Sequence, residues 1–280
     1  MKVGIVGLGL IGGSIALDLR QLRGYTILGV SRRPATCQQA IARGVVDDAS
    51  PDLAILSAAD VIFLCTPLDA IKPTVEQLLP HLAPTTVLTD VGSVKQPIVE
   101  AIAPLWHNFV GGHPMAGTAD SGLDAAQKEL FVNRAYVLTP IDTTPPDAVE
   151  VVATIARSLQ AQVYQCAPLA HDQAVAWISH LPVMVSSSLI AACLQETNST
   201  VLELAQTFAS SGFRDTSRVG GGNPELGLMM AKYNQTALLR SLQTYRDQLD
   251  QTISLIEQAN WEALEAQLEQ THDSRPTFVD

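Results

Sequence analysis

The chain has 280 residues, of which 47% are hydrophobic, so it is long enough to bury a large core and to form two domains. Its formal net charge of −11 at pH 7 argues against nucleic acid or an anionic membrane surface as a partner. Cys37, Cys65, Cys166 and Cys193 are scattered, with no zinc spacing, so we expect no metal site and a reducing, cytoplasmic environment. We also expect no signal peptide and no membrane anchor, because a strand begins at residue 2 and the longest apolar stretch, 181–194, is short and interrupted by serines.

A glycine-rich motif follows the first expected strand, residues 2–6. It reads Gly7-Leu8-Gly9-Leu10-Ile11-Gly12, the G-x-G-x-x-G pattern between a strand and a helix. The first glycine permits a tight turn, the second lets the backbone approach a pyrophosphate, and the third lets the helix pack against the strand. The free N–H groups at the start of the helix form an anion site. Such turns also have purely structural uses, but the flanking strand and helix favour a dinucleotide site made by Gly7, Gly9, Leu10, Ile11 and Gly12.

The end of the second expected strand, residues 25–30, predicts which dinucleotide is bound. An NAD site usually carries an Asp or Glu here, which accepts from the ribose 2′-hydroxyl. This chain has Ser31, Arg32 and Arg33 instead, and Thr36 follows as a further donor. A hydroxyl and two guanidiniums suit a 2′-phosphate. Two solvated arginines on a turn are the alternative, but the position favours NADP.

Strand and helix patterns alternate along the first half of the chain, which predicts a parallel, doubly wound sheet. Further strands are expected at residues 61–65, 86–89, 109–111 and 135–138, with helices between them, for example at 69–82 and 94–102. A final strand at 162–166 completes an NADP-binding domain that we place at residues 1–166.

The remainder, residues 167–280, lacks strand signals and predicts an all-helical domain. Asn223 and Pro224 are typical of a helix start, so Gly220 to Gly222 form an entry turn and not a second phosphate loop. One apolar stripe is long enough to be the centre of this domain, as core of one chain or shared between two subunits; it comprises Leu238, Leu242, Tyr245, Leu249, Ile253 and Ile256. The predicted fold class is a Rossmann-type, doubly wound α/β domain followed by an all-helical domain.

Chemically active residues follow three of the expected strands, at the edge where open parallel sheets bind ligands. Thr66 and Pro67 follow the third strand near the expected cofactor, and Ser93 lies in the turn after the fourth. His113, held between glycines and a proline after the fifth, is the predicted general base, because an imidazole takes a hydroxyl proton at neutral pH. Ser93 either orients His113 or holds the same hydroxyl. The alternative is that His113 only satisfies a turn.

The helical half carries two further sets of polar residues. His171-Asp172 and His180 are about nine residues apart, and we expect them on the same side of one helix, although a single histidine there is more often structural. Arg214 and Arg218 are four residues apart, one turn if the segment is helical. One of them is expected to bind a substrate carboxylate, and the other to pair with Asp215 or solvent.

The order of motifs resembles one family along nearly the whole chain. The motifs are G-L-G-L-I-G-G-S at the start, T-D-V-G-S-V-K at 89–95, G-G-H-P-M-A-G-T at 111–118, F-V-N-R-A-Y-V-L-T-P at 131–140, H-D at 171–172, S-H-L-P at 179–182 and G-F-R-D-T-S-R at 212–218. They are similar to the prephenate/arogenate dehydrogenases of tyrosine biosynthesis. The resemblance implies a nucleotide-binding domain, a helical dimerisation domain and hence a homodimer, with the active site between the domains.

The resemblance also implies a reaction, the oxidative decarboxylation of a cyclohexadienyl substrate, with hydride transfer to the nicotinamide. His113 matches the family's catalytic histidine and Ser93 its partner at the ring hydroxyl. Arg218 matches the arginine that binds substrate carboxylate, and Asp172 and His180 match polar residues of the helical wall. We add Gly117, Thr118 and Arg214 as expected substrate contacts.

One departure from the family pattern bears on the substrate. Some members that use prephenate carry a second histidine three residues after the position of His180, where this chain has Val183. Prephenate has a keto acid side chain and arogenate an amino acid side chain. The absence of this second histidine, a cationic partner, and the negative net charge of the protein favour arogenate. Prephenate is the alternative.

Two other functions compete with this hypothesis. A hydroxy-acid dehydrogenase of the 3-hydroxyisobutyrate type needs a lysine with a nearby asparagine, but Lys232 and Asn234 are two apart, on opposite sides of a helix. A non-catalytic NADP sensor would not need His113, Ser93 and Arg218 together. We therefore expect an NADP-dependent dehydrogenase.

Overall fold

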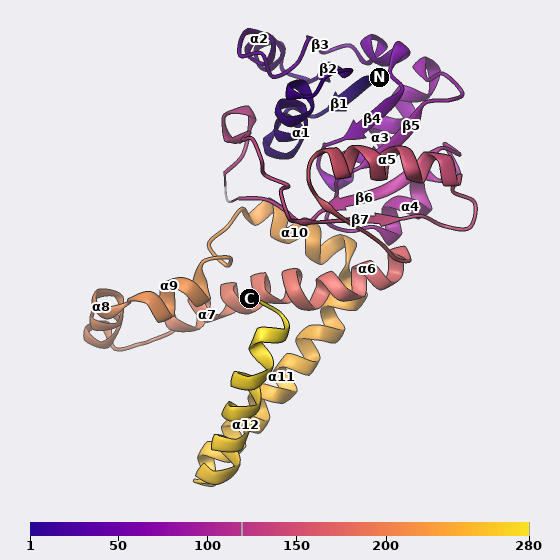
Figure 1. The fold of residues 1–280 in the computed structure, drawn as a ribbon. Coiled ribbons are helices and arrows are strands. Elements are labelled where there is room, and N and C mark those ends of the chain that lie inside the picture. Colours follow the sequence, from indigo (N-terminus) through magenta and orange to yellow (C-terminus); the bar gives the residue numbers. More distant parts are fainter. Residues whose placement is uncertain (119, 280) are drawn as a thin grey trace.

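The computed structural model describes residues 1–118 and 120–279, which form an α/β domain and a helical domain with two arms (Figure 1). The sheet has eight strands in the order β3-β2-β1-β4-β5-β6-β7-β8. Their bounds are β1 Lys2–Val6, β2 Thr26–Val30, β3 Asp48–Ser50, β4 Val61–Leu64, β5 Val87–Asp90, β6 Phe109–Pro114, β7 Ala135–Thr139 and β8 Gln162–Gln165. This arrangement confirms the Rossmann-type fold.

Strand β7 departs from the expected parallel sheet, because it runs antiparallel to β6. A parallel connection needs a crossover of a dozen or more residues, usually a helix. Between β6 and β7 the described residues form only a 3-10 turn, Leu123–Ala125, so the chain returns in the opposite direction. The helix after β7 then makes β8 parallel to it. Strand β3 was not predicted because it is a three-residue edge strand with little apolar character.

Helices cover both faces of the sheet. In the α/β domain they are α1 Leu10–Gln21, α2 Pro34–Ala42, α3 Leu68–Leu78, α4 Gln96–Ile102 and α5 Pro146–Ser158. One core cluster contains Ile15 of α1 and Val152 of α5, and the other contains Ile71 of α3 and Ile98 of α4. Helices α1 and α5 therefore pack on one face and α3 and α4 on the other, as a doubly wound sheet requires.

The helical domain begins with a long, continuous helix, residues 168–193. It consists of α6 Pro168–Val175, a π-helical turn Ala176–His180 and α7 Leu181–Cys193. Within the described residues it is the one helix that meets the length and composition of a membrane span, with mean hydropathy 1.5, so the apolar segment is longer than we expected. Core helices of soluble proteins meet the same criteria. Here the first part of the helix packs against the α/β domain through buried His171 and Asp172.

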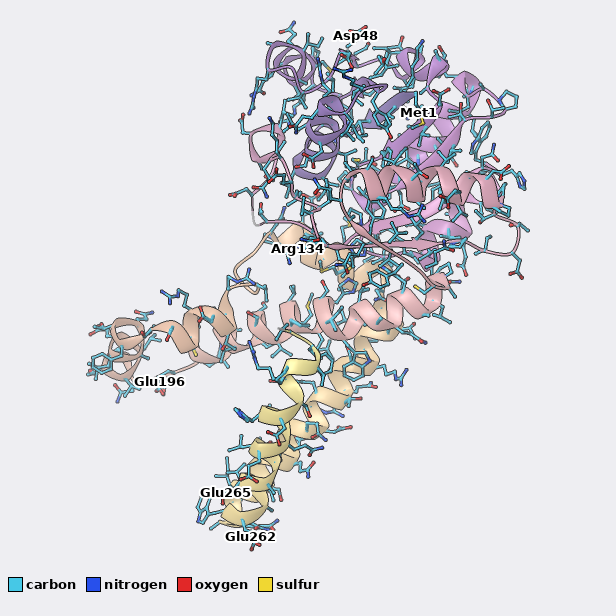
Figure 2. All side chains as sticks on the ribbon, viewed as in Figure 1. Met1, Asp48, Arg134, Glu196, Glu262 and Glu265 are labelled. Atoms are coloured by element: carbon cyan, nitrogen blue, oxygen red, sulfur yellow. The ribbon has the colours of Figure 1, made fainter. Side chains whose placement is uncertain are left out.

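The other helices are α8 Ser199–Phe208, α9 Ser211–Ser217, α10 Pro224–Tyr233, α11 Gln235–Glu257 and α12 Trp261–Ser274. Helices α8 and α9 with the end of α7 form one arm, α11 and α12 form the other, and α10 lies beneath the α/β domain (Figure 1). In Figure 2, Glu196 marks the end of one arm, and Glu262 and Glu265 mark the end of the other. The apolar stripe of α11 is buried at Leu238, but Ile256 is 51% exposed. The stripe is therefore core at its start and lies open along the arm.

Gly220 brings its segment close to the backbone of α7. Its N–H donates to Ser186 Oγ at 2.8 Å, and the same hydroxyl donates to the carbonyl of Thr216 at 2.9 Å. A Cβ at Gly220 would overlap backbone atoms of Ser186 and Ser187 in α7. At Gly221, by contrast, the nearest atom would be 3.9 Å away. The entry turn expected at Gly220 to Gly222 therefore holds α9 against α7.

We predict that Gly220→Ala destabilises the helical domain by roughly 1–3 kcal/mol, the usual cost of overpacking. The neighbouring atoms belong to backbone, which cannot move aside as a flexible side chain does. Urea unfolding followed by circular dichroism measures the change, and Gly221→Ala serves as the matched control with little loss. Equal stability of the two variants would contradict the close contact.

Candidate active site

The glycine motif lies where β1 turns into α1, and each glycine fits its expected role. Gly7 has φ +102°, a conformation that side chains rarely adopt, and a Cβ on Gly7 or Gly12 would overlap a backbone carbonyl. At Gly9 a Cβ would meet no atom within 4 Å, so this position is open for the approach of a pyrophosphate. Helix α1 starts at Leu10 with no side-chain cap and no acidic residue in its first turn. These residues fit a dinucleotide.

The basic turn after β2 lies next to this motif. Val6 and Val30 pair in the parallel sheet, and Gly7 N–H donates to Val30 O at 2.9 Å. Arg32 and Arg33 are exposed, and neither forms an ion pair within residues 1–118 and 120–279. Ser31 Oγ accepts from Arg33 N–H at 3.4 Å, and Thr36 is buried in α2. The two guanidiniums are therefore available beside the glycine loop.

His113 lies at the carboxyl end of β6, in a chain of three polar side chains. Its Nδ1 is 2.8 Å from His171 Nε2, and His171 Nδ1 is 2.8 Å from Asp172 Oδ1. Because an ionised carboxylate only accepts, His171 Nδ1 carries a proton. With both rings neutral, His171 Nε2 accepts from His113 Nδ1–H. This arrangement leaves His113 Nε2 as an unprotonated acceptor, which a general base requires.

Asp172 also joins the helical domain to the α/β domain. Its Oδ1 accepts from Lys95 N–H at 2.7 Å, and its Oδ2 accepts from Gln96 N–H at 2.8 Å. These N–H groups begin α4, where an anion is stabilised by the helix dipole and by unpaired donors. Asp172 therefore caps a helix of one domain while it orients a histidine of the other.

A buried ion pair lies beneath the strand that carries His113. Lys95 Nζ pairs with Asp90, both side chains are fully buried, and Lys95 Nζ also donates to Gly112 O at 2.7 Å. Asp90 Oδ1 accepts from Gly112 N–H at 3.1 Å. Burial lowers the pKa of Lys95, and the charge of Asp90 opposes this shift. Both the N–H and the carbonyl of Gly112, the residue before His113, are therefore held by the pair.

Burial also keeps His113 and His180 neutral. His113 is 9% exposed, and desolvation holds its pKa well below 6.5; the neighbouring His171, Lys95 and His180 lower it further. Desolvation lowers the pKa of His180 to about 4, although Asp172 opposes the shift. Neutral imidazole at physiological pH is the form that accepts a proton.

The π-helical turn aligns Asp172 with His180. An unbroken α-helix turns by about 100° per residue, so positions eight apart point about 80° away from each other. The turn at 176–180 holds an extra residue, which returns His180 to the side of Asp172. Asn234 reaches both, since its Nδ2 is 2.7 Å from Asp172 O and 3.2 Å from His180 Nδ1. We expected one regular helix, and a π turn is what places these residues together.

Three predicted site residues have buried polar atoms with no hydrogen-bond partner among the described residues. They are Thr66 Oγ1, Ser93 Oγ and His180 Nε2. Buried polar groups in proteins are usually paired, so each unpaired one is free to bind a water or a ligand. Thr66 and Ser93 follow β4 and β5 at the carboxyl edge of the sheet, on which His113 also lies. No group of three or more His, Cys, Asp or Glu suited to a metal occurs in the part of the chain described.

Other predicted residues lie apart from this cluster. Pro67 precedes α3, and Gly117 and Thr118 are exposed after β6, where Thr118 Oγ1 accepts from Asp120 N–H at 3.2 Å. Arg214 lies on α9 and Arg218 directly after it; both are exposed, and α9 packs along α7 in the arm (Figure 1).

Arg214 is 3.5 Å from Asp215. Within the described residues, no hydrogen bond or ion pair joins either arginine to the histidine cluster. Their part in substrate binding stays a prediction.

Sequence reasoning assigned no role to three residues of the cluster, His171, Asp90 and Lys95. All three lie within the H-D and T-D-V-G-S-V-K motifs, and membership in these motifs was the signal that could have identified them.

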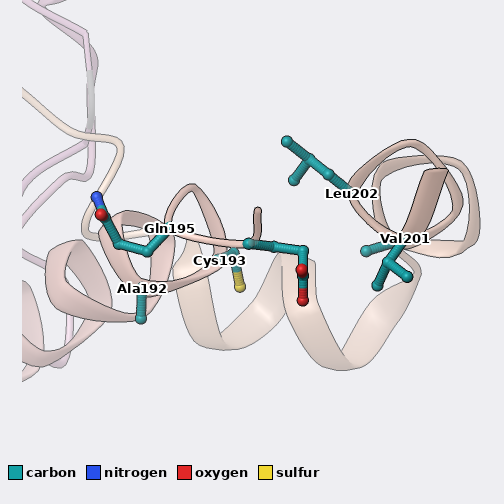
Figure 3. Close-up of a pocket in the computed structure, with 7 residues that line it drawn as sticks. Ala192, Cys193, Gln195, Val201 and Leu202 are labelled. Atoms are coloured by element: carbon teal, nitrogen blue, oxygen red, sulfur yellow. The ribbon is translucent and has the colours of Figure 1, made fainter. Parts of the chain in front are cut away.

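An open hollow between the end of α7 and α8 is a separate feature, lined by Ala192, Cys193, Val201 and Leu202 among others (Figure 3). Its lining contains none of the residues of the histidine cluster.

Comparisons with known proteins agree with this architecture. A family model described as prephenate dehydrogenase, nucleotide-binding domain, matches residues 15–165. A second, described as prephenate dehydrogenase, dimerization domain, matches residues 167–270. Together these two models cover most of the chain.

Individual relatives give the same result. The crystal structure of Synechocystis arogenate dehydrogenase is similar with a TM-score of 0.90 and 56% identity, over 100% of both chains. The structure of prephenate dehydrogenase from A. aeolicus, in complex with hydroxyphenyl propionate and NAD+, gives a TM-score of 0.93 at 26% identity, over 99% of this chain and 98% of that one. Prephenate dehydrogenase of Bacillus subtilis (strain 168) is 32% identical over 266 residues, which are 93% of this chain and 71% of the relative. The chain therefore belongs to the prephenate/arogenate dehydrogenase family, oxidoreductases of tyrosine biosynthesis with a Rossmann-type nucleotide-binding domain and a helical second domain.

Proposed function

We propose that the protein is an NADP-dependent arogenate dehydrogenase, which converts arogenate to tyrosine by oxidative decarboxylation. The observation that carries this proposal is the Asp172–His171–His113 chain, which leaves an unprotonated nitrogen on a buried, neutral histidine at the carboxyl edge of the sheet. We assign the NADP-binding domain to residues 1–166 and the helical domain to residues 167–280. The domain contact made by Asp172 then lies at the active site.

His113 acts as the general base in this proposal. Its Nε2 takes the proton of the ring hydroxyl, and Ser93 Oγ holds the same oxygen. The positive charge that develops on His113 is shared with His171, whose Nδ1–H donates to Asp172. This arrangement offsets the cost of charging a buried imidazole.

The remaining steps balance the reaction. When bound at the glycine loop, the nicotinamide would supply the acceptor for the hydride of the ring carbinol carbon. The C–C bond to the ring carboxylate breaks, carbon dioxide leaves, and its electron pair enters the ring, which becomes aromatic. The phenolate oxygen takes the proton back from His113, so the base returns to its neutral form.

Two features support the choice of cofactor and substrate. Arg32 and Arg33 are exposed and unpaired in the described part of the chain, beside an open Gly9, and they favour a 2′-phosphate and hence NADP. Val183, in place of a histidine, and the likeness to Synechocystis arogenate dehydrogenase favour arogenate. Several relatives are named prephenate dehydrogenases, so oxidation of prephenate to 4-hydroxyphenylpyruvate is the second candidate.

We also infer that the protein is a cytoplasmic homodimer joined through its helical domain. Large apolar side chains of the helical domain are exposed in one chain, among them Phe208 (71%), Leu228 (63%), Trp261 (60%) and Leu268 (58%). Patches of this kind mark interaction sites. A second copy of the helical domain carries the same exposed apolar side chains and could cover them.

The first prediction concerns substrate and cofactor together. We expect the highest kcat/KM with arogenate and NADP when arogenate and prephenate are each assayed with NADP and NAD. The reason is that Val183 favours arogenate, while Arg32 and Arg33 favour NADP. A preference for prephenate would overturn the substrate choice and keep the mechanism. No turnover of either substrate would instead favour a non-catalytic NADP sensor.

The second prediction concerns His113. Because burial holds its pKa well below 6.5, the neutral base predominates at pH 6.5 and above, and the acid limb of kcat/KM should lie below pH 6.5. His113→Asn should lower kcat by on the order of 10²–10⁴ while NADP binding persists. Steady-state kinetics across pH and cofactor fluorescence titration measure these effects. Near-normal turnover of the variant would remove His113 as the base.

The third prediction concerns Arg32. Arg32→Ala should weaken the binding of NADP by about 1.5–3 kcal/mol, the scale of a charged hydrogen bond, and leave the binding of NAD nearly unchanged. Arg23→Ala is the matched control, because Arg23 is an exposed arginine between α1 and β2, at the other edge of the sheet. KM values for both cofactors decide the outcome. Equal losses with NADP and NAD would mean that Arg32 is structural.

A further inference from the structure

Asn234 lies between α10 and α11 and is one of the few buried polar residues of the helical domain, at 6% exposed. Figure 1 shows this junction beneath the α/β domain, beside α6. An asparagine between two helices usually accepts from backbone N–H groups as a cap. Here the side chain makes no cap bond to α11. Its amide points instead to Asp172 O and His180 Nδ1, at 2.7 Å and 3.2 Å.

The first of these contacts fixes the orientation of the amide. The carbonyl of Asp172 only accepts, so the atom 2.7 Å from it is the NH₂ nitrogen and not the amide oxygen. The same nitrogen faces His180 Nδ1 with its second hydrogen. His180 Nδ1 therefore accepts and carries no proton.

The tautomer of His180 follows from this contact. Neutral imidazole has one N–H, and with Nδ1 as acceptor that N–H is on Nε2. The Nε2 atom is buried and has no partner among the described residues, and the whole residue is 0% exposed. A buried donor without a protein partner needs an acceptor from a bound water or from a ligand.

We propose that Asn234 is a positioning residue, which fixes His180 as a neutral Nε2–H donor to an acceptor oxygen of the substrate. The proposal rests on the proposed function, because it takes the substrate to lie against His180. A carboxylate is the strongest acceptor that a cyclohexadienyl acid offers. Asn234 acts only through His180 and need not touch the substrate.

The tautomer itself is tested on the wild-type protein, without substrate. ¹⁵N-labelled histidine is observed by long-range ¹H–¹⁵N correlation near neutral pH, and His180→Gln identifies the signal of His180. We expect Nδ1 to be unprotonated and Nε2 to be protonated. A protonated Nδ1 would overturn the proposal, and this result does not depend on whether any substrate turns over.

The positioning role is tested by a double-mutant cycle with Asn234→Ala and His180→Gln. Asn234→Ala should raise KM for arogenate at least tenfold with a smaller change in kcat. In the His180→Gln background the same substitution should change KM by less than about threefold, because the residue through which Asn234 acts is already gone. If Asn234 has only a structural role, Asn234→Ala should raise KM equally in both backgrounds, and this result would overturn the proposal. A wild-type KM in the Asn234→Ala single variant would overturn it as well.

Asn223→Ala is the matched control, since Asn223 caps the other end of α10 through Glu225 N–H and does not belong to the cluster. It should leave KM unchanged. If Asn234→Ala does not fold, the tautomer of His180 in the wild type decides the proposal. Absence of turnover with every substrate refutes the proposed function. A protonated Nδ1 on His180 refutes the role of Asn234, so the two failures are distinguished.

Discussion

The carboxylate of Asp172 is the contact on which the arrangement of the site depends. One oxygen accepts from Lys95 N–H and from His171, and the other accepts from Gln96 N–H. The same group therefore docks the helical domain on α4 and sets the proton positions on His171 and His113. With charge-assisted bonds of this kind in a buried site, geometry and protonation state are determined together.

The buried pair of Asp90 and Lys95 supplements this contact from inside the α/β domain. Replacing a buried ion pair with apolar residues is often neutral or stabilising, so such pairs are weak evidence for stability. Here the pair holds both backbone polar groups of Gly112, its N–H and its carbonyl. Its structural value is the fixed position of the next residue, His113, in surroundings that keep the imidazole neutral.

Much of the fold was predictable, because glycine spacing and strand–helix alternation are local signals. The Gly7 turn and the sequence of strands follow from them. The antiparallel β7 was not predictable from alternation, since it results from a connection without a helix. The π turn at 176–180 was also missed, because an apolar segment with helical periodicity does not show where one extra residue is accommodated.

The sequence singled out candidate residues but not their contacts. His113 and Ser93 were proposed from their turns, but the partner of His113 is 58 residues away, and Lys95 and Asp172 are 77 apart. Sequence spacing gives no measure of such distances. It also did not show that Arg214 and Arg218 lie on an arm, apart from the cluster within one chain.

The division of the histidine chain between two domains has a consequence during synthesis on the ribosome. The glycine loop and His113 emerge first, and His171 and Asp172 follow only after β8 is complete. A nascent chain that has reached the end of β8 contains the glycine loop, but its His113 lacks the partner that assigns its tautomer. In the proposed mechanism, proton transfer by His113 therefore waits for the docking of the second domain, whereas the glycine loop is complete without it.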